Sequence, residues 1–272
     1  MKPLLKWAGG KQKLLAQILP HVPSKIYNYY EPFFGGGAMF FNLPHQPENS
    51  FLSDNNEELI NFYNTVKNNM PALITSINAI SHTKEAYYVI RELDRTASWP
   101  ATLSKIPRAA RFLYLNKNCY NGLYRTNKQG QFNTPYGKYK NPTMFKLNDM
   151  KRAFHMFNKP NKVAFNYSNF DLITPAYLDD FVYFDPPYHP ITKTSFVNYG
   201  PMVFGKAEQY RLAELCAKLA RKNIKFLLSN SYCDFTLDLY RQYDIITINA
   251  KRYINSNAKG RGNIKEILVK NY

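Results

Sequence analysis

The chain has 272 residues and a formal net charge of +17, from 36 basic and 19 acidic side chains. A chain of this length can bury one sizeable core and carry a small appended module. Because the charge exceeds what solubility requires, it predicts a polyanionic partner, either nucleic acid or an anionic membrane surface. The sequence has no apolar run long enough to span a membrane and no apolar signal segment after Met1, so we expect a cytoplasmic protein.

The cysteine and histidine residues form no metal-binding pattern. The three cysteines are odd in number and lack Cys-x-x-Cys spacing, which argues against a disulfide framework and a zinc site. The five histidines are dispersed along the chain. We therefore expect no bound metal.

The first segment that predicts chemistry is a strand followed by a glycine turn. A strand expected at residues 26–30 leads into Glu-Pro-Phe-Phe-Gly-Gly-Gly at 31–37, and an apolar stretch that we expect to be helical follows at 38–43. This order receives nucleotide-like ligands, and glycines let the backbone approach a ligand where a Cβ would collide with it. Taken alone, an ordinary glycine-rich loop is the better interpretation.

A second short strand, expected at residues 51–54, ends in Asp54. Asp54 lies about 20 positions after the glycines, the spacing at which a carboxylate meets the hydroxyls of a ribose. The competing interpretation makes Asp54 the N-cap of a helix at residues 55–66.

The middle of the chain is basic, because no Asp or Glu occurs between Asp94 and Asp149. The basic residues of this interval include Lys105, Arg108, Arg111, Lys117, Arg125, Lys128, Lys138, Lys140 and Lys146. Aromatic residues are interleaved with them, whereas a membrane-binding helix would show one apolar face. A helical pattern at 109–115, followed by short aromatic strands around 128–131, predicts a helical insertion that carries a DNA-reading β-hairpin.

Within this insertion Arg125 is the candidate for a base contact, because its planar fork can pair with guanine O6 and N7. Lys138 and Lys140 are better assigned to phosphates, which position a protein on DNA without reading its sequence. For any single lysine, a solvated surface position explains the charge equally well.

The most informative motif is Asp-Pro-Pro-Tyr at 185–188, directly after the apolar run at 181–184. Proline has no backbone donor and a fixed φ, so the Asp185 carboxylate and the Pro186 carbonyl can accept both N–H bonds of a planar amino group. Tyr188 offers a ring for stacking, which suits a flipped base held for reaction. The plainer interpretation is a strand that ends in a Pro-Pro turn.

The rest of the chain predicts a doubly wound α/β sheet. Strands are expected at residues 162–167, 181–184, 225–229, 244–249 and 265–270, and the helix at 206–221 has the apolar stripe of a helix packed on a sheet. The segment 191–204 fits a lid over an extruded base and a disordered loop equally well.

These motifs together resemble the Dam-type (GATC-specific) DNA adenine N6-methyltransferases, in the order in which that family carries them. The matching segments are Lys-Trp-Ala-Gly-Gly-Lys at 6–11, Phe-x-Gly-x-Gly at 33–37, Ser-Asp-x-Asn at 53–56, Tyr-Asn-Gly-Leu-Tyr-Arg at 120–125 with the hairpin at 130–139, and Asp-Pro-Pro-Tyr at 185–188. The resemblance implies a class I methyltransferase (Rossmann-like) mixed seven-stranded sheet with helices on both faces. It further implies a catalytic domain of residues 1–98 and 149–272, with a DNA-recognition insertion at 99–148.

The resemblance also implies the roles of individual residues. The catalytic residues would be Asp185, Pro186 and Tyr188. Contacts to S-adenosylmethionine would come from Trp7, Lys11, Asp54 and Asp185, with Phe33, Gly35 and Gly37 shaping the pocket. Phe170, which follows the strand expected at 162–167, is a further candidate for packing on the cofactor adenine. Contacts to DNA would come from Tyr120, Asn121, Leu123, Arg125, Lys138 and Tyr139.

The implied reaction is methyl transfer to a flipped-out adenine of GATC in double-stranded DNA. No cysteine neighbours Asp185, so we expect direct transfer without a covalent adduct. The rival interpretations are a protein or RNA amino-group methyltransferase, a cytosine N4 methyltransferase and a catalytically silent DNA-binding scaffold. We expect a monomer that binds no membrane, and the sequence leaves open whether a restriction endonuclease accompanies it.

Overall fold

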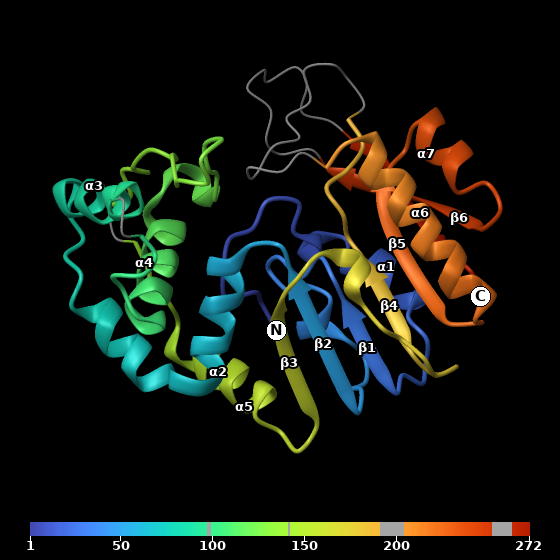
Figure 1. Ribbon diagram of the computed structural model, residues 1–272, viewed down its shortest axis with the longest axis horizontal. Helices are drawn as coiled ribbons and strands as arrows, with labels where there is room; N and C mark the ends of the chain where they lie inside the picture. The colour runs from blue at the N-terminus through green and yellow to red at the C-terminus, as the bar shows by residue number, and fades with distance from the viewer. Residues whose placement is uncertain (97–98, 141, 191–203, 252–262) are drawn as a thin grey trace.

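The computed structural model describes residues 1–96, 99–140, 142–190, 204–251 and 263–272 (Figure 1). Its centre is a seven-stranded sheet in the order β3-β2-β1-β4-β5-β7-β6. The strands are β1 (Asn28–Glu31), β2 (Asn49–Asp54), β3 (Lys162–Tyr167), β4 (Phe181–Phe184), β5 (Lys225–Ser231), β6 (Asp244–Lys251) and β7 (Asn263–Lys270). Neighbouring strands from β3 to β5 pair in parallel, whereas β7 pairs antiparallel with β5 and β6. The predicted mixed seven-stranded sheet of class I methyltransferases is confirmed.

The strand order reverses between β1 and β4. From β1 the chain moves outward to β2 and β3, then returns to β4 on the other side of β1. Open sheets of this kind bind ligands at the carboxyl ends of the strands beside such a switch point. The glycine segment after β1 and the tetrapeptide after β4 therefore meet at one edge of the sheet.

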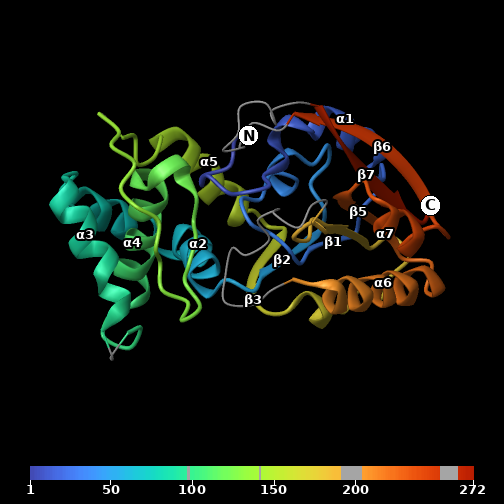
Figure 2. The same cartoon turned by 90° about the horizontal axis from the view of Figure 1, so that it is seen from above.

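Helices cover both faces of the sheet, and Figure 2 shows α1 and α6 on opposite faces. The helices are α1 (Leu15–Ile18), α2 (Glu57–Asn78), α3 (Lys84–Glu92), α4 (Lys105–Asn118), α5 (Leu147–Phe157), α6 (Lys206–Arg221) and α7 (Asp234–Leu239). Strands β1 and β4 are buried along their whole length because both of their faces are covered. Among the described residues, no helix is long and apolar enough to cross a membrane.

The helix expected after the glycine turn does not form. Only a 3₁₀ turn, Phe40–Asn42, follows the glycines, and Leu43 is extended with ψ of 135°. Pro44 comes next in the chain, and the residue before a proline is disfavoured in the helical region. No helix N-terminus therefore faces a ligand at this point, contrary to the expectation from the sequence.

Helices α3 and α4 stand beside the sheet, beyond α2 (Figure 1). Arg111 of α4 donates to the backbone carbonyls of Ile90 and Arg91 in α3. Helix α3 thus joins α4 although it precedes residue 99, and the domain boundaries at 99 and 148 stay predictions.

The predicted hairpin is present, but its strands are reduced to single bridges. Thr126 pairs with Phe132, and Cys119 pairs with Tyr136, both antiparallel. The Asn127 carbonyl accepts a hydrogen bond from the Gly130 backbone N–H at 3.0 Å, which closes the turn between the two sides. The predicted lid falls on residues 191–203, outside the described ranges.

Candidate active site

Three side chains from two distant parts of the chain converge at the carboxyl end of β4. The Lys11 Nζ lies 2.7 Å from Asp185 Oδ1, and their side chains are 5% and 19% exposed. The same ammonium lies 4.5 Å from the centroid of the Tyr188 ring and donates to the Gly9 carbonyl at 2.8 Å. The structure therefore brings together one residue predicted for the cofactor and two residues of the predicted catalytic tetrapeptide.

Burial and neighbouring charges act in opposite directions on Asp185. Burial raises the pKa of Asp185, Lys11 lowers it, and the nearby Glu266 raises it. Glu31, at the end of β1, has a pKa raised well above the ordinary value, mainly by burial, and accepts a hydrogen bond from the Tyr29 hydroxyl at 2.8 Å. The site thus contains two buried carboxyl groups whose pKa values are raised, Asp185 and Glu31, and the Lys11 ammonium opposes the shift at Asp185.

Asp54 supports the glycine turn. Its carboxylate accepts the Gly35 backbone N–H at 2.9 Å and the Asn56 backbone N–H at 3.0 Å. Asn56 is the N-cap of α2, because its side chain accepts from the Leu59 N–H, so Asp54 does not have the capping role considered above. Burial raises the pKa of Asp54 to about 6.

The structure requires glycine at these positions for a reason other than the expected close approach of a ligand. Gly35 has a φ of +48°, and a Cβ there would lie 2.6 Å from the Trp7 indole. Gly37 has a φ of +69°, and a Cβ there would lie 2.5 Å from the Phe34 ring. A side chain at either position is excluded by the protein's own aromatic rings and by the backbone conformation.

Aromatic rings gather beside the turn. The rings of Phe33 and Phe170 stack with centroids 5.2 Å apart, and Phe204 packs edge-on against Phe33. Phe170 lies just after β3, so these rings lie beside the glycine turn at the carboxyl ends of the strands.

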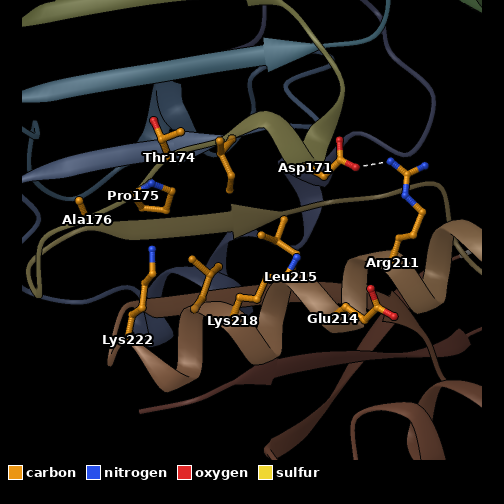
Figure 3. A pocket seen from close by; sticks show the side chains of 11 residues that line it. Asp171, Thr174, Pro175, Ala176, Arg211, Glu214, Leu215, Lys218 and Lys222 are labelled. Atoms are coloured by element: carbon orange, nitrogen blue, oxygen red, sulfur yellow. Dashed lines mark hydrogen bonds and ion pairs between the residues drawn. The ribbon is translucent and has the colours of Figure 1, made fainter.

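A pocket of about 410 Å³ lies between α6 and the connection from β3 to β4 (Figure 3). The ion pair of Asp171 and Arg211 closes one end, and Lys222 lies at the other. Of the described residues that line it, none belongs to the set predicted to bind the cofactor. The pocket is therefore separate from the convergence at Asp185.

The residues predicted to contact DNA all lie on the hairpin and its base. Tyr120, Asn121 and Lys138 are exposed, whereas Leu123 is partly buried. The Arg125 Nε donates to Asn133 Oδ1 at 2.7 Å, across the hairpin.

The N-terminal segment links the hairpin to the glycine turn. The Lys6 Nζ lies 4.6 Å from the centroid of the Tyr139 ring, and the Lys6 backbone is held on both sides by the buried Asn116 amide. Trp7 touches the glycine turn and also stacks on Tyr124, with ring centroids 5.7 Å apart.

Several polar residues of the site have no role in the predictions made from the sequence. The most prominent is Glu266 of β7, whose Oε2 accepts a hydrogen bond from the Tyr188 hydroxyl at 2.7 Å. Glu31 was noticed only as part of the glycine motif. The available signal was a carboxylate directly before the apolar run 267–269 of an expected strand, since such a charge is rarely buried without a partner.

Comparison with known proteins agrees with the geometry. A family model described as the D12 class N6 adenine-specific DNA methyltransferase matches residues 7–254. The type II methyltransferase M.MjaIII of Methanocaldococcus jannaschii is 39% identical, covering 100% of this chain and 99% of its own. M1.LlaDCHI of Lactococcus lactis is 37% identical, covering 100% and 96%, and the DNA adenine methylase of Serratia marcescens is 33% identical, covering 98% and 97%. The chain belongs to the D12 class of N6 adenine-specific DNA methyltransferases.

Proposed function

We propose that this DNA adenine methyltransferase uses S-adenosylmethionine and acts on the adenine of GATC in double-stranded DNA. The observation that carries the proposal is the convergence of Asp185, Lys11 and Tyr188 at the switch point of the sheet. An acceptor, a cation and an aromatic face are the groups that an amino-bearing base and a zwitterionic cofactor require.

The hydrogen-bonding capacity of the site fits this cofactor. Lys11 has three N–H donors, of which two face Asp185 and Gly9, so one is left for the methionine carboxylate. Asp54 has about four acceptor sites on its carboxylate, and the backbone N–H groups of Gly35, Asn56 and Asn55 use up to three of them, which leaves acceptor capacity for a ribose hydroxyl. Trp7 and the rings at Phe33 and Phe170 would supply the apolar contacts.

When bound, the cofactor supplies an electrophilic methyl group on a sulfonium. The chain's own contribution is to hold the amine that receives it. The Asp185 carboxylate and the Pro186 carbonyl would accept the two N–H bonds of the adenine amino group, which localises the lone pair on nitrogen. Asp185 would also stabilise the positive charge that develops there, and Tyr188 would stack on the ring.

The hairpin would read the target. The hydrogen bond from Arg125 to Asn133 holds the plane of the Arg125 guanidinium, and a fixed plane favours a bidentate contact to guanine. Lys138 and Lys140, both exposed, would contact phosphates. We assign target recognition to residues 99–148 and catalysis to 1–98 and 149–272, acting as a monomer.

The names of two relatives bear on the biological setting. The M. jannaschii and L. lactis proteins are named as type II methyltransferases, which supports a companion restriction endonuclease for this chain as well. A nuclease gene beside this one, whose product is blocked by prior methylation, is the observation that tests this assignment.

The cofactor assignment is tested by equilibrium binding of labelled S-adenosylmethionine. We expect Asp54→Ala and Lys11→Met to weaken binding at least about tenfold, because each removes a charge-assisted contact. Asp238→Ala is the matched control, since that side chain is 77% exposed. Equal affinity for all four proteins would contradict the assignment.

A further inference from the structure

The hydroxyl group of Tyr188 is hydrogen-bonded to the buried carboxyl group of Glu266, which comes from another strand of the sheet. Glu266 lies in β7 and is 8% exposed. It pairs with Ser231 of β5 and Ile248 of β6, so strands on both sides hold its backbone. Its Oε2 accepts the Tyr188 hydroxyl at 2.7 Å. Hydrogen bonds to an ionised acceptor are stronger and more directional than those between neutral groups.

The backbone on either side of Tyr188 is hydrogen-bonded to buried side chains. It is held by three buried polar side chains, Gln209, Asn230 and Ser231. The Pro187 carbonyl accepts from Gln209 Nε2 at 3.1 Å, and the His189 N–H donates to Asn230 Oδ1 at 3.1 Å. The side-chain amides of Asn230 and Gln209 also form a hydrogen bond with each other, in which Asn230 donates to Gln209 at 3.0 Å. What remains free at Tyr188 is the rotation of its side chain.

The ring of Tyr188 lies between two charged contacts. One face meets the Lys11 ammonium, which is bound to Asp185, and the hydroxyl at the tip meets Glu266. Since the backbone is pinned, the hydrogen bond at the tip decides the tilt of the ring relative to the Asp185 carboxylate. The same Glu266 charge contributes to the raised pKa of Asp185, which places it close to the reacting group.

We propose that Glu266 is a positioning residue for methyl transfer: by holding the Tyr188 hydroxyl, it sets the plane on which the target adenine stacks in front of Asp185. This inference rests on the proposed roles of Asp185 and Tyr188. Glu266 touches neither substrate in this account and acts through the tyrosine ring.

Three variants separate this role from a purely structural one. Glu266→Gln keeps an acceptor oxygen for the tyrosine hydroxyl. Glu266→Leu keeps a comparable volume and removes the acceptor. Tyr188→Phe keeps the ring and removes the donor. Melting temperature and S-adenosylmethionine affinity, measured for each variant, report on folding and on the cofactor site.

The test is the single-turnover rate of methyl transfer to a GATC duplex at saturating cofactor. We expect Glu266→Leu and Tyr188→Phe each to slow transfer by about 10- to 100-fold, the worth of one hydrogen bond to a charged group. We expect the Glu266→Gln rate to lie between those of wild type and Glu266→Leu, because glutamine keeps a neutral acceptor in place of a carboxylate. We expect the Glu266→Leu, Tyr188→Phe double variant to be no slower than the slower single one, because both remove the same contact.

A spectroscopic readout accompanies the rates. With 2-aminopurine in place of the target adenine, we expect the fluorescence of the bound duplex to differ between wild type and Glu266→Leu, since stacking on Tyr188 changes, and to match between wild type and Glu266→Gln.

Several results would overturn the inference. They are a wild-type rate for Glu266→Leu, a double variant whose loss is the product of the two single losses, or a Glu266→Gln rate as low as that of Glu266→Leu. If Glu266→Leu does not fold, Tyr188→Phe decides alone, because a wild-type rate there excludes any role for the contact. A wild-type protein that methylates no adenine in GATC would instead contradict the proposed function.

Discussion

One buried carboxylate joins the hairpin to α4, which makes Asp94→Ala a sharp test of the structure. The Asp94 side chain is 6% exposed, and its Oδ2 lies 2.8 Å from the Arg111 guanidinium of α4. The same oxygen accepts the Phe132 backbone N–H at 2.7 Å. Oδ1 lies 2.7 Å from Arg95, which in turn donates to the Phe132 carbonyl. One side chain thus joins α3, α4 and the hairpin.

The expected cost follows from what Asp94→Ala leaves behind. Removing one partner of a buried ion pair costs about 3–5 kcal/mol, and an unpaired buried N–H costs about 1–3 kcal/mol. The Arg111 guanidinium keeps its two backbone carbonyl acceptors and its place 4.8 Å from the Trp99 ring, which offsets part of the loss. We therefore expect the free energy of unfolding to fall by about 3–5 kcal/mol in total.

Urea denaturation of the purified variants measures this loss. Asp238→Ala is the control, because its partner Arg241 is 81% exposed and such surface pairs contribute about 0–1 kcal/mol. Asp94→Asn keeps an acceptor for the Phe132 N–H and should fall between the two. If Asp94→Ala and Asp238→Ala unfold at the same urea concentration with the same slope, the structural reasoning is refuted.

Three further predictions concern the site itself. Asp185→Ala should abolish methyl transfer while DNA affinity is retained, because the acceptor of the amino group is lost and the hairpin is unchanged; single-turnover rates and gel shifts measure the two. Arg125→Ala should reduce discrimination between GATC and altered sites by about 1–3 kcal/mol, whereas Lys138→Ala should weaken binding to all duplexes alike and lower its salt dependence. The folded pKa of Asp54, about 6, lies above its unfolded value, so its contribution to stability is complete below pH of about 4 and is lost as the pH rises to about 6. Over that window the carboxylate forms, so cofactor affinity should increase, and Asp54→Asn should remove both pH dependences.

A specific result would contradict each of these predictions. Residual transfer by Asp185→Ala near the wild-type rate would remove that carboxylate from the reaction. Equal loss of specific and nonspecific binding on removal of Arg125 would make it a phosphate contact. A cofactor affinity that does not change between pH 4 and 6 would show that the Asp54 carboxylate does not meet the ribose.

The sheet and its helices were largely predictable because their signals are local. The expected strands at 162–167 and 181–184 and the expected helix at 206–221 coincide with β3, β4 and α6. Each is an apolar run or an apolar stripe that needs no distant partner to be recognised. Helix α2 was predicted to end at 66 but extends to Asn78, since it continues past Pro71 with a kink at Asn69.

The site was less predictable because its geometry depends on distant contacts. The three glycines at 35–37 predict a tight turn. The position of the Trp7 indole beside Gly35, however, depends on how the N-terminal segment packs, which the local sequence does not indicate. Likewise, nothing near Glu266 in the sequence points to Tyr188, because the two are joined by strand order and are 78 residues apart. The motif residues could be named, but the residues that hold them could not.

The most direct test is methyl transfer from tritiated S-adenosylmethionine to three duplexes that contain GATC, a scrambled site, or GATC with its adenine replaced. We expect label in the GATC duplex alone, recovered as N6-methyladenine. Label in adenine of the scrambled duplex at the same rate would contradict the assignment of GATC reading to the hairpin, and the absence of label despite tight DNA binding would contradict the proposed reaction.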